Sequence, residues 1–334
     1  MIIESGFKPA WWLMNGHGQT LYPTMMRRVT APVDKMERVE LPDGDFIDLA
    51  WAVNGLAGDT PLVILLHGLG GSIESTYAAG LMSVFNQHGW RAMLMHFRGA
   101  SQEPNRLARA YHSGDTGDLD YLLHVLAERE PDTLKAVVGV SLGGNVVLKW
   151  LGEQGEQHLV NPAVAVSVPF QLRLVADKIG QGFSRIYQSY LLRRLKKVFS
   201  RKIALLKPDL PEELMNVNQW HCFWTFDEKV TAPLHGFANV HAYYRQASCH
   251  SYLSKIATPT LIIHALDDPF MTPDVVPEEQ ALSEQVTLEL SKRGGHVGFI
   301  SGGVPGRPVY WLEERIPVHL QQHFSQFGID GSIE

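Results

Sequence analysis

A single serine stands between two glycines at a point where the sequence changes character. Residues 134–140, LKAVVGV, form a short apolar run typical of a buried strand, and residues 145–153, NVVLKWLGE, have a helical pattern. Between them Ser141 is flanked by Gly139 and Gly143 in the order G-x-S-x-G. A sharp turn in this pattern lifts the serine hydroxyl above a sheet. The pattern predicts a nucleophile elbow; the alternative is an ordinary strand–turn–helix connection in a chain with 30 glycines.

A serine nucleophile needs a base, and the base needs a group that orients it. The apolar run 259–265 is followed by Asp267 and Asp268, and His296 follows a pair of glycines after the last predicted strand. The order serine, aspartate, histidine is that of α/β-hydrolases. Because Pro269 comes directly after it, Asp268 is the favoured orienting acid. Asp267 is the alternative, and the remaining aspartate would bind backbone N–H groups of the turn.

Two backbone N–H groups could stabilise an oxyanion beside this serine. Residues 67–71, HGLGG, follow the apolar run 62–66 directly, as expected for a donor loop at the same end of the sheet. The predicted oxyanion hole consists of the N–H groups of Leu69 and Leu142. The alternative for residues 67–71 is an ordinary glycine-rich turn.

Short apolar runs bounded by glycine, proline or charged residues recur along the chain and predict buried strands. These runs are residues 61–68, 91–97, 134–140, 162–169, 259–265 and 285–291, the last of which we expect to be the final strand. Residues 36–53 predict an opening hairpin. Helical patterns lie between the strands, as at 113–130 with Asp115 or Thr116 as the N-cap, and a terminal helix is expected at 308–323. The alternation predicts an α/β fold whose mostly parallel central sheet has helices on both faces.

One section interrupts this alternation. Residues 170–252 contain successive helical patterns and predict a helical insertion within a single domain that spans residues 1–334. We expect the insertion to be a lid whose aromatic residues shape an apolar pocket; a subdomain whose aromatic residues serve only its own core is the alternative. Its basic run at 193–202, RRLKKVFSRK, fits a solvated helix face, with contact to an anionic lipid surface or substrate as the second interpretation. Residues 1–35 should form an N-terminal arm over the core.

The composition argues against several classes of function. The 334 residues carry a net charge of −6, so no overall basic field favours nucleic-acid binding. Cys222 and Cys249 give neither a disulfide framework nor a metal-ligand spacing, and the 15 histidines are scattered. No stretch approaches the roughly 18 apolar residues of a membrane span. We therefore expect a cytoplasmic protein without metal or other cofactor, whose contact with any membrane surface would be transient.

Several motifs together resemble one known family, the YheT-like esterases of the α/β-hydrolase superfamily. The similarity covers nearly the whole chain and is carried by NGHGQT (15–20), LPDGDFIDLAW (41–51), MHFRGAS (95–101), YHSGDTGD (111–118), GVSLGGN (139–145), HALDDPFM (264–271) and GGHVGF (294–299). The resemblance implies a catalytic triad of Ser141, Asp268 and His296 and a cytosolic hydrolase of carboxylic esters. It does not imply a particular substrate.

These features predict two-step acyl transfer. His296 would deprotonate Ser141 for attack on an ester carbonyl, Asp268 would orient the imidazole, and water would then release the acid. We expect small-molecule substrates with short- to medium-chain acyl groups or acylglycerol-like lipids. An acyltransferase, a thioesterase or a peptidase could use the same triad. From another class, a non-catalytic binding protein on this fold is the remaining alternative, although a pure binder has no need of all three triad members.

Overall fold

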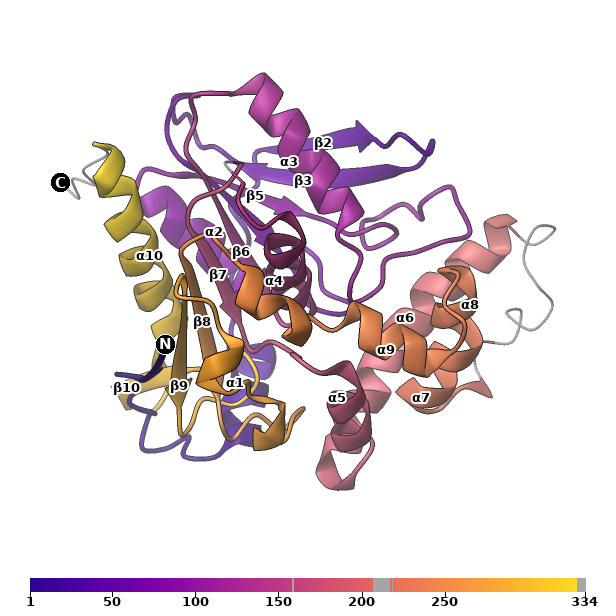
Figure 1. Ribbon diagram of the computed structural model, residues 1–334. Coiled ribbons are helices and arrows are strands. Elements are labelled where there is room, and N and C mark those ends of the chain that lie inside the picture. The colour runs from indigo at the N-terminus through magenta and orange to yellow at the C-terminus, as the bar shows by residue number, and fades with distance from the viewer. Residues whose placement is uncertain (158, 207–216, 218, 329–334) are drawn as a thin grey trace.

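In the computed structural model, which describes residues 1–157, 159–206, 217 and 219–328, nine strands form one sheet in the order β1-β9-β8-β7-β6-β4-β5-β3-β2 (Figure 1). The strands are β1 (Ile2–Glu4), β2 (Lys35–Glu40), β3 (Phe46–Ala52), β4 (Leu62–Leu66), β5 (Arg91–Met95), β6 (Lys135–Val140), β7 (Ala163–Val166), β8 (Thr260–Ala265) and β9 (Val286–Ser291). All six predicted apolar runs and the opening hairpin are confirmed as strands.

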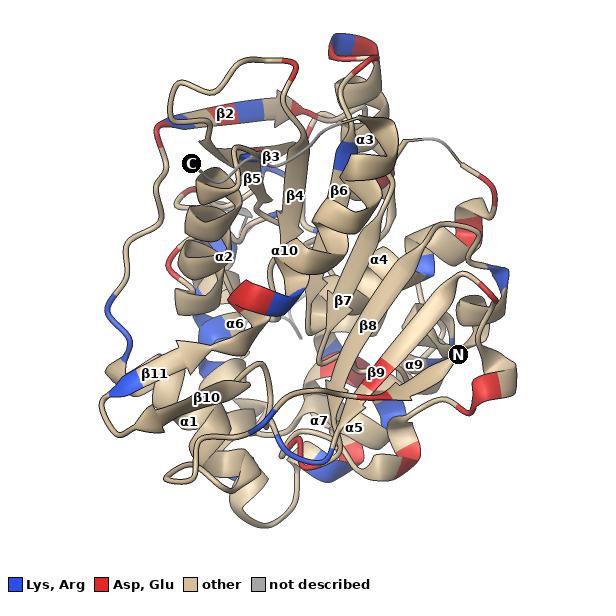
Figure 2. Ribbon diagram, turned by 90° about the vertical axis from the view of Figure 1, so that its left-hand side faces the viewer, with Lys and Arg blue, Asp and Glu red and all other residues tan. Residues whose placement is uncertain are grey.

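The sheet is parallel from β1 to β5 and antiparallel where β3 joins β5 and β2 joins β3. Strands β4, β6, β7 and β8 are buried along their whole length, because helices cover both faces of the sheet. The edge strand β2 instead carries alternating acidic and basic residues (Figure 2). Charges of this kind discourage a further strand from pairing with an open edge.

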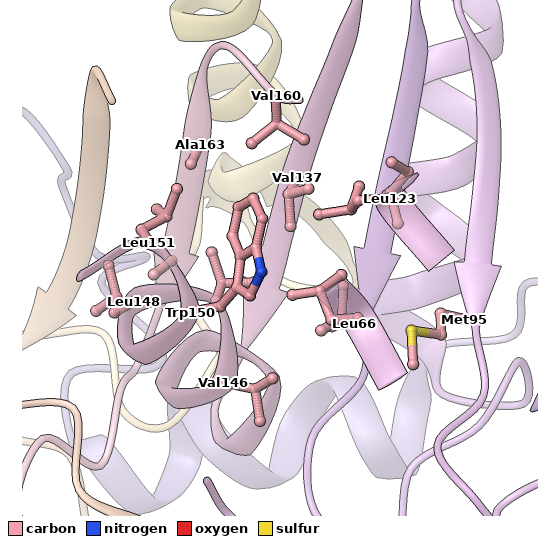
Figure 3. Packing of buried hydrophobic residues seen from close by; sticks show 14 of the residues in the cluster. Leu66, Met95, Leu123, Val137, Val146, Leu148, Trp150, Leu151, Val160 and Ala163 are labelled. Atoms are coloured by element: carbon pink, nitrogen blue, oxygen red, sulfur yellow. The ribbon is translucent and has the colours of Figure 1, made fainter. Parts of the chain in front are cut away.

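Two helices pack on each face of the sheet. Helices α3 (Gly117–Arg129) and α4 (Leu142–Gln154) contribute to one apolar cluster, and α2 (Thr76–Gln87) and α10 (Trp311–Phe324) contribute to the other. Trp150 of α4 lies in the first cluster, between the helix and residues such as Val137 and Ala163 of the strands (Figure 3). This packing fixes α4, and hence the turn that precedes it, against the sheet.

The expected N-cap of α3 is only partly correct. Thr116 holds the N-cap position, but its side chain makes no capping bond and donates instead to Glu153. Asp115 is not the cap, since its carboxylate pairs with Arg109. Of the two candidate residues, Thr116 is thus confirmed as the N-cap, although both side chains bond to partners outside the helix terminus.

The region after β9 differs from the prediction. Strands β10 (Ile300–Val304) and β11 (Arg307–Tyr310) form a separate antiparallel hairpin, so β9 is not the final strand and the terminal helix begins at Trp311, not at 308. The sequence here has no continuous apolar run, and its glycines obscure the strand pattern. The hairpin is stabilised from a distance, because Gln19 bonds both the N–H and the C=O group of Ile300.

Helices follow one another in the described part of residues 170–252 and gather beyond one end of the sheet (Figure 1). They are α5 (Leu172–Ile179), α6 (Arg185–Leu206), α7 (Phe223–Phe226), a π-helical turn (Asp227–Thr231), α8 (Ala232–Leu234) and α9 (Val240–Ala247). Residues 207–216 and 218 of the predicted insertion lie outside the described residues. Among the described helices, none is both long enough and apolar enough to cross a bilayer.

Candidate active site

Ser141 lies on a strained turn between β6 and α4. Its backbone has φ +54° and ψ −117°, an unfavourable region for a residue with a β-carbon. A β-carbon on Gly139 would lie 2.4 Å from the carbonyl oxygen of Gly143, and one on Gly143 would lie 2.4 Å from the carbonyl oxygen of Leu66. Only glycine fits at either position, so both glycines are required for the close approach of strand and helix. The Ser141 N–H group donates to Val166 of β7 at 2.8 Å, which anchors the turn to the neighbouring strand.

Three predicted residues from three loops meet at this turn. The Nε2 atom of His296 lies 2.9 Å from the Ser141 hydroxyl, and its Nδ1 atom lies 2.7 Å from the Asp268 carboxylate. Because a carboxylate only accepts, Nδ1–H is the donor to Asp268 and Nε2 is left to accept the serine proton. The ring of Phe270 stacks on the imidazole at a centroid distance of 3.9 Å and 12° between the planes. In this arrangement the imidazole accepts a hydrogen bond from the Ser141 hydroxyl and donates one to the Asp268 carboxylate, as a general base in this position must.

The two aspartates after β8 have different partners. Asp268 contacts the imidazole and also accepts the N–H group of Phe270 at 2.8 Å. Asp267 points elsewhere and accepts the N–H group of Gly295 at 2.9 Å. Burial raises the pKa of Asp267. The structure thus places Asp268 against the imidazole and Asp267 against the backbone of the loop that carries His296.

The loop after β4 leaves one N–H group free between two that are occupied. Gly68 donates its N–H to the hydroxyl of Tyr77 at 2.8 Å, and Gly70 donates its N–H to the hydroxyl of Tyr111 at 2.8 Å. Leu69 lies between them, and its N–H group has no acceptor among the described residues. Two tyrosines therefore fix the loop while the amide of Leu69 stays available for a ligand.

The second predicted N–H donor has the same property. Leu142 is the first residue of α4, and its N–H group also has no acceptor in the described part of the chain. A β-carbon on Gly68 would lie 3.2 Å from the Ser141 β-carbon, so the loop that carries Leu69 passes close to the serine. The N–H group of Leu142 thus follows Ser141 in the chain, and the N–H group of Leu69 lies in the neighbouring loop.

His67, although next to this loop, has a structural environment. Its Nδ1 atom donates to the carbonyl oxygen of Gly68 at 2.8 Å, and its Nε2 atom accepts the N–H group of Phe97 at 3.3 Å. Burial lowers its pKa to about 3, so the imidazole is neutral at ordinary pH. With both nitrogen atoms occupied, His67 braces the loop.

A largely apolar cavity of about 410 Å³ opens at the serine. Helix α5 contributes Leu172, Val175, Ala176 and Ile179, and α6 contributes Ile186, Tyr187, Tyr190, Leu191 and Arg194. Among the large apolar residues of the insertion, Tyr187, Tyr190, Leu191 and Phe223 line the cavity, whereas Phe183, Trp224 and Phe226 do not. Phe226 is buried among the helices, and Phe183 is exposed. The described helices of 170–252 thus contribute residues to the cavity wall and also share an apolar cluster of their own.

The N-terminal segment holds the histidine loop, a role that the sequence analysis missed. Helix α1 (Gly16–Met26) has Asn15 as its N-cap, so the motif NGHGQT forms its first turn. The hydroxyl of Thr20 accepts the backbone N–H group of His296 at 2.8 Å and donates to Gly16 at 2.7 Å. A β-carbon on Gly16 would lie 1.9 Å from the carbonyl oxygen of Asp267, so this helix also packs directly on the aspartate turn.

The same segment reaches the helices above the site. His17 Nδ1 lies 3.0 Å from the hydroxyl of Tyr187, whose ring packs against Phe270 at 4.9 Å. Phe270 in turn stacks on His296. The only signal in the sequence for the contact of His17 with Tyr187 is the motif itself, because the two residues lie 170 positions apart.

The sequence analysis also missed Arg194, which lines the cavity. It belongs to the basic run 193–202, for which a solvated helix face is the first interpretation and contact with an anionic lipid surface or substrate the second. Helical periodicity distinguishes Arg194 from the rest of the basic run. It shares one face of α6 with the cavity-lining residues before it, at the spacing i, i+3, i+4 and i+7 of Tyr187, Tyr190, Leu191 and Arg194. Figure 2 colours the basic residues of α6 blue.

No group of three or more potential metal ligands occurs among the described residues. One pair with H-x-x-x-H spacing is present on α10, His319 and His323, with ring centroids 4.8 Å apart. Burial lowers the pKa of both imidazoles. The pair lies on a helix that packs on the opposite face of the sheet from α4.

Comparison with known proteins places this geometry in context. The family model described as alpha/beta hydrolase fold matches residues 61–303. "Putative esterase YheT" of Escherichia coli (strain K12) is 45% identical over 312 residues, 93% of this chain and 92% of that protein. Monoacylglycerol lipase of Saccharomyces cerevisiae is 31% identical over 246 residues, 72% of this chain and 55% of that protein. Among solved structures, the esterase Pf2001 of Pyrococcus furiosus aligns with a TM-score of 0.54 and 17% identity, covering 87% of this chain and 93% of that one.

The structural likeness supports the fold, and the sequence likeness over nearly the whole chain supports the family. The predicted resemblance and the predicted α/β fold are both confirmed. The chain belongs to the α/β-hydrolase superfamily, among the relatives of YheT, and its relatives include esterases and lipases.

Proposed function

We propose that the protein is a serine hydrolase of carboxylic esters. The observation that carries the proposal is the continuous hydrogen-bonded row from Ser141 through His296 to Asp268, with distances of 2.9 Å and 2.7 Å. The row lies beside two N–H groups, of Leu69 and Leu142, that lack an acceptor among the described residues. A nucleophile, a base oriented by an acid, and a pair of free donors are the parts that acyl transfer requires.

The mechanism follows from the roles of these groups. His296 takes the Ser141 proton through Nε2 as the hydroxyl oxygen attacks the ester carbonyl. The carbonyl oxygen gains negative charge and accepts hydrogen bonds from the N–H groups of Leu69 and Leu142. His296 then gives its proton to the departing alcohol, which leaves an acyl-enzyme. Water, deprotonated by His296, attacks this ester, and His296 returns the proton to the Ser141 oxygen as the acid leaves; Asp268 stabilises the imidazolium at each stage.

The cavity supports a substrate with an apolar acyl group. Its walls from α5 and α6 are mostly aliphatic or aromatic, and its volume of about 410 Å³ suits a short- to medium-chain acyl ester or an acylglycerol-like lipid. A relative named monoacylglycerol lipase agrees with this class. Within one domain, the described helices of residues 170–252 then act as a lid that shields the acyl-binding cavity from bulk solvent.

Replacing the nucleophile or the base tests the proposal. We expect Ser141→Ala and His296→Ala each to lower kcat for 4-nitrophenyl butyrate by roughly 10⁴–10⁶, because the two residues act as one unit. Stopped-time assays on purified variants, with thermal melting as the control for folding, measure this. Near-wild-type turnover by either folded variant would remove the mechanism.

The two aspartates make an internal comparison. Asp268→Asn should lower kcat by about 10⁴, because an amide at this position favours the wrong imidazole tautomer. Asp267→Asn should lower it much less, since this side chain contacts only backbone. Kinetics of the two variants side by side give the ranking, and the reverse ranking would make Asp267 the orienting acid.

The hydroxyl of Thr20 should matter for kcat. Thr20→Val keeps the shape of the side chain but leaves the His296 N–H group unpaired, so we expect kcat to fall by about 10–100-fold with little change in KM. Thr20→Ser restores the acceptor and should restore kcat. Equal kcat for the valine and serine variants would show that the bond does not position the histidine.

Adjacent leucines on α6 test the lid. Leu191 lines the cavity, whereas Leu192 is buried in the lid's own core. Leu191→Ala should shift the kcat/KM profile for 4-nitrophenyl esters toward longer acyl chains, by about 10-fold between butyrate and decanoate. Leu192→Ala is the matched control and should leave the shape of the profile unchanged. An unshifted profile for Leu191→Ala would leave the helices as scaffold only.

A further inference from the structure

Arg194 is a cation in the wall of an otherwise largely apolar cavity. It is the single lysine or arginine among the described residues that line the cavity. Its stem packs on Gly70, where a β-carbon would lie 3.1 Å from the Arg194 β-carbon and 3.6 Å from Nε. Gly70 belongs to the loop that carries the free N–H group of Leu69. The stem of Arg194 therefore lies at the edge of the proposed oxyanion hole.

This guanidinium lacks an anionic partner. Its one hydrogen bond goes from Nη1 to the hydroxyl of Tyr190 at 2.7 Å, and among the described residues no carboxylate reaches it. By contrast, the buried arginines Arg91 and Arg98 are paired with Glu130 and Asp118. The remaining N–H groups of the Arg194 guanidinium can make a bidentate contact with a carboxylate or phosphate, and such contacts are stronger than neutral ones.

The order of the strands separates the cavity into two sides. Ser141 follows β6, whose neighbours in the sheet are β7 on one side and β4 on the other. The chain after β7 continues into α5, whose cavity-lining residues are all apolar. The chain after β4 lines the opposite side with residues 68–71 and 74–77, among which Glu74, Ser75 and Thr76 are polar, whereas α5 contributes no polar side chain. Arg194 reaches over from α6 to this polar side, through its contact with Gly70.

We infer that Arg194 forms a subsite for an anionic group on the alcohol part of the ester substrate. This inference rests on the proposed hydrolase function and names its substrate class. The acyl chain lies along α5, the carbonyl oxygen lies at the N–H groups of Leu69 and Leu142, and the alcohol extends past Gly70. A phosphate or carboxylate on that alcohol then meets the guanidinium of Arg194, while the hydroxyl of Tyr190 holds the guanidinium in place.

The exposed carboxylate of Glu74 is the one acidic side chain that lines the cavity on this same side, among the described residues. The side of the cavity that would hold the acyl chain has no lysine or arginine to bind an anion, because Arg194 is the only such residue in the described cavity wall. The preference is therefore directional: an anion on the alcohol is favoured and an anion on the acyl chain is not.

Three esters with the same acyl chain test this subsite. They are 1-hexanoyl-glycerol, 1-hexanoyl-glycerol 3-phosphate and hexanoyloxyacetate, which are neutral, phosphate-bearing and carboxylate-bearing. The variants are Arg194→Gln and its matched control Arg193→Gln, which removes the same charge from an adjacent exposed residue that does not line the cavity. We expect Arg194→Gln to lower kcat/KM for one or both anionic esters by about 10–100-fold and to leave the neutral ester within about 2-fold. The phosphate and carboxylate arms show which anion the subsite takes.

Each other outcome has a definite meaning. If Arg194→Gln lowers kcat/KM equally for the neutral and the anionic esters, Arg194 acts on the oxyanion or on the stability of the fold, and the subsite is overturned. Equal losses in Arg193→Gln would reduce the effect to general attraction of anions. Unchanged kinetics for all three esters in Arg194→Gln would also overturn it. Titration calorimetry of Ser141→Ala with 1-hexanoyl-glycerol 3-phosphate measures binding without turnover. If wild type hydrolyses none of the esters, the proposed function fails, while weaker binding after Arg194→Gln in that background would still support the subsite.

Discussion

The reversal of the chain at Ser141 is the constraint on which the rest of the site depends. Strand β6 must end and α4 must begin within one residue, and the backbone of Ser141 takes a positive φ of 54° to do so. That turn is tolerable because β6 is paired on both sides, with β4 and β7, and because Gly139 and Gly143 let strand and helix pass at close range. Once the turn is fixed, the loops after β4, β8 and β9 all end near the same hydroxyl group.

The loop that carries His296 needs support from outside the sheet. Val297 and Phe299 on this loop have positive φ values of 61° and 44°, which are costly for residues with branched or bulky side chains. The N-terminal segment compensates through contacts that span almost the whole chain, chiefly Thr20 with the His296 N–H group and Gln19 with Ile300. A histidine that must move protons at a fixed distance is thereby held by elements from both ends of the sequence.

Local patterns explain which features were predictable. The buried strands, the turn at Ser141 and the loop positions of Asp268 and His296 all follow from short apolar runs and the residues that end them. Strand β1 and the hairpin β10–β11 lack such runs and form through distant partners. Helix α1 contains Pro23 and two glycines, so its propensity is low and its contacts with the loop at 294–300 stabilise it. Arg194 was concealed by its neighbours, because a count of charges in 193–202 ignores which face of the helix each one occupies.

The central claim is that Ser141 is an activated nucleophile, and covalent labelling tests it most directly. The folded protein is treated with a fluorophosphonate and digested, and the modified peptide is sequenced by mass spectrometry. The account predicts one phosphonylated residue, Ser141, and loss of that label in His296→Ala, since the serine reacts only when the imidazole takes its proton. Labelling of a different residue, or no labelling of Ser141 in the folded wild-type protein, would contradict the account.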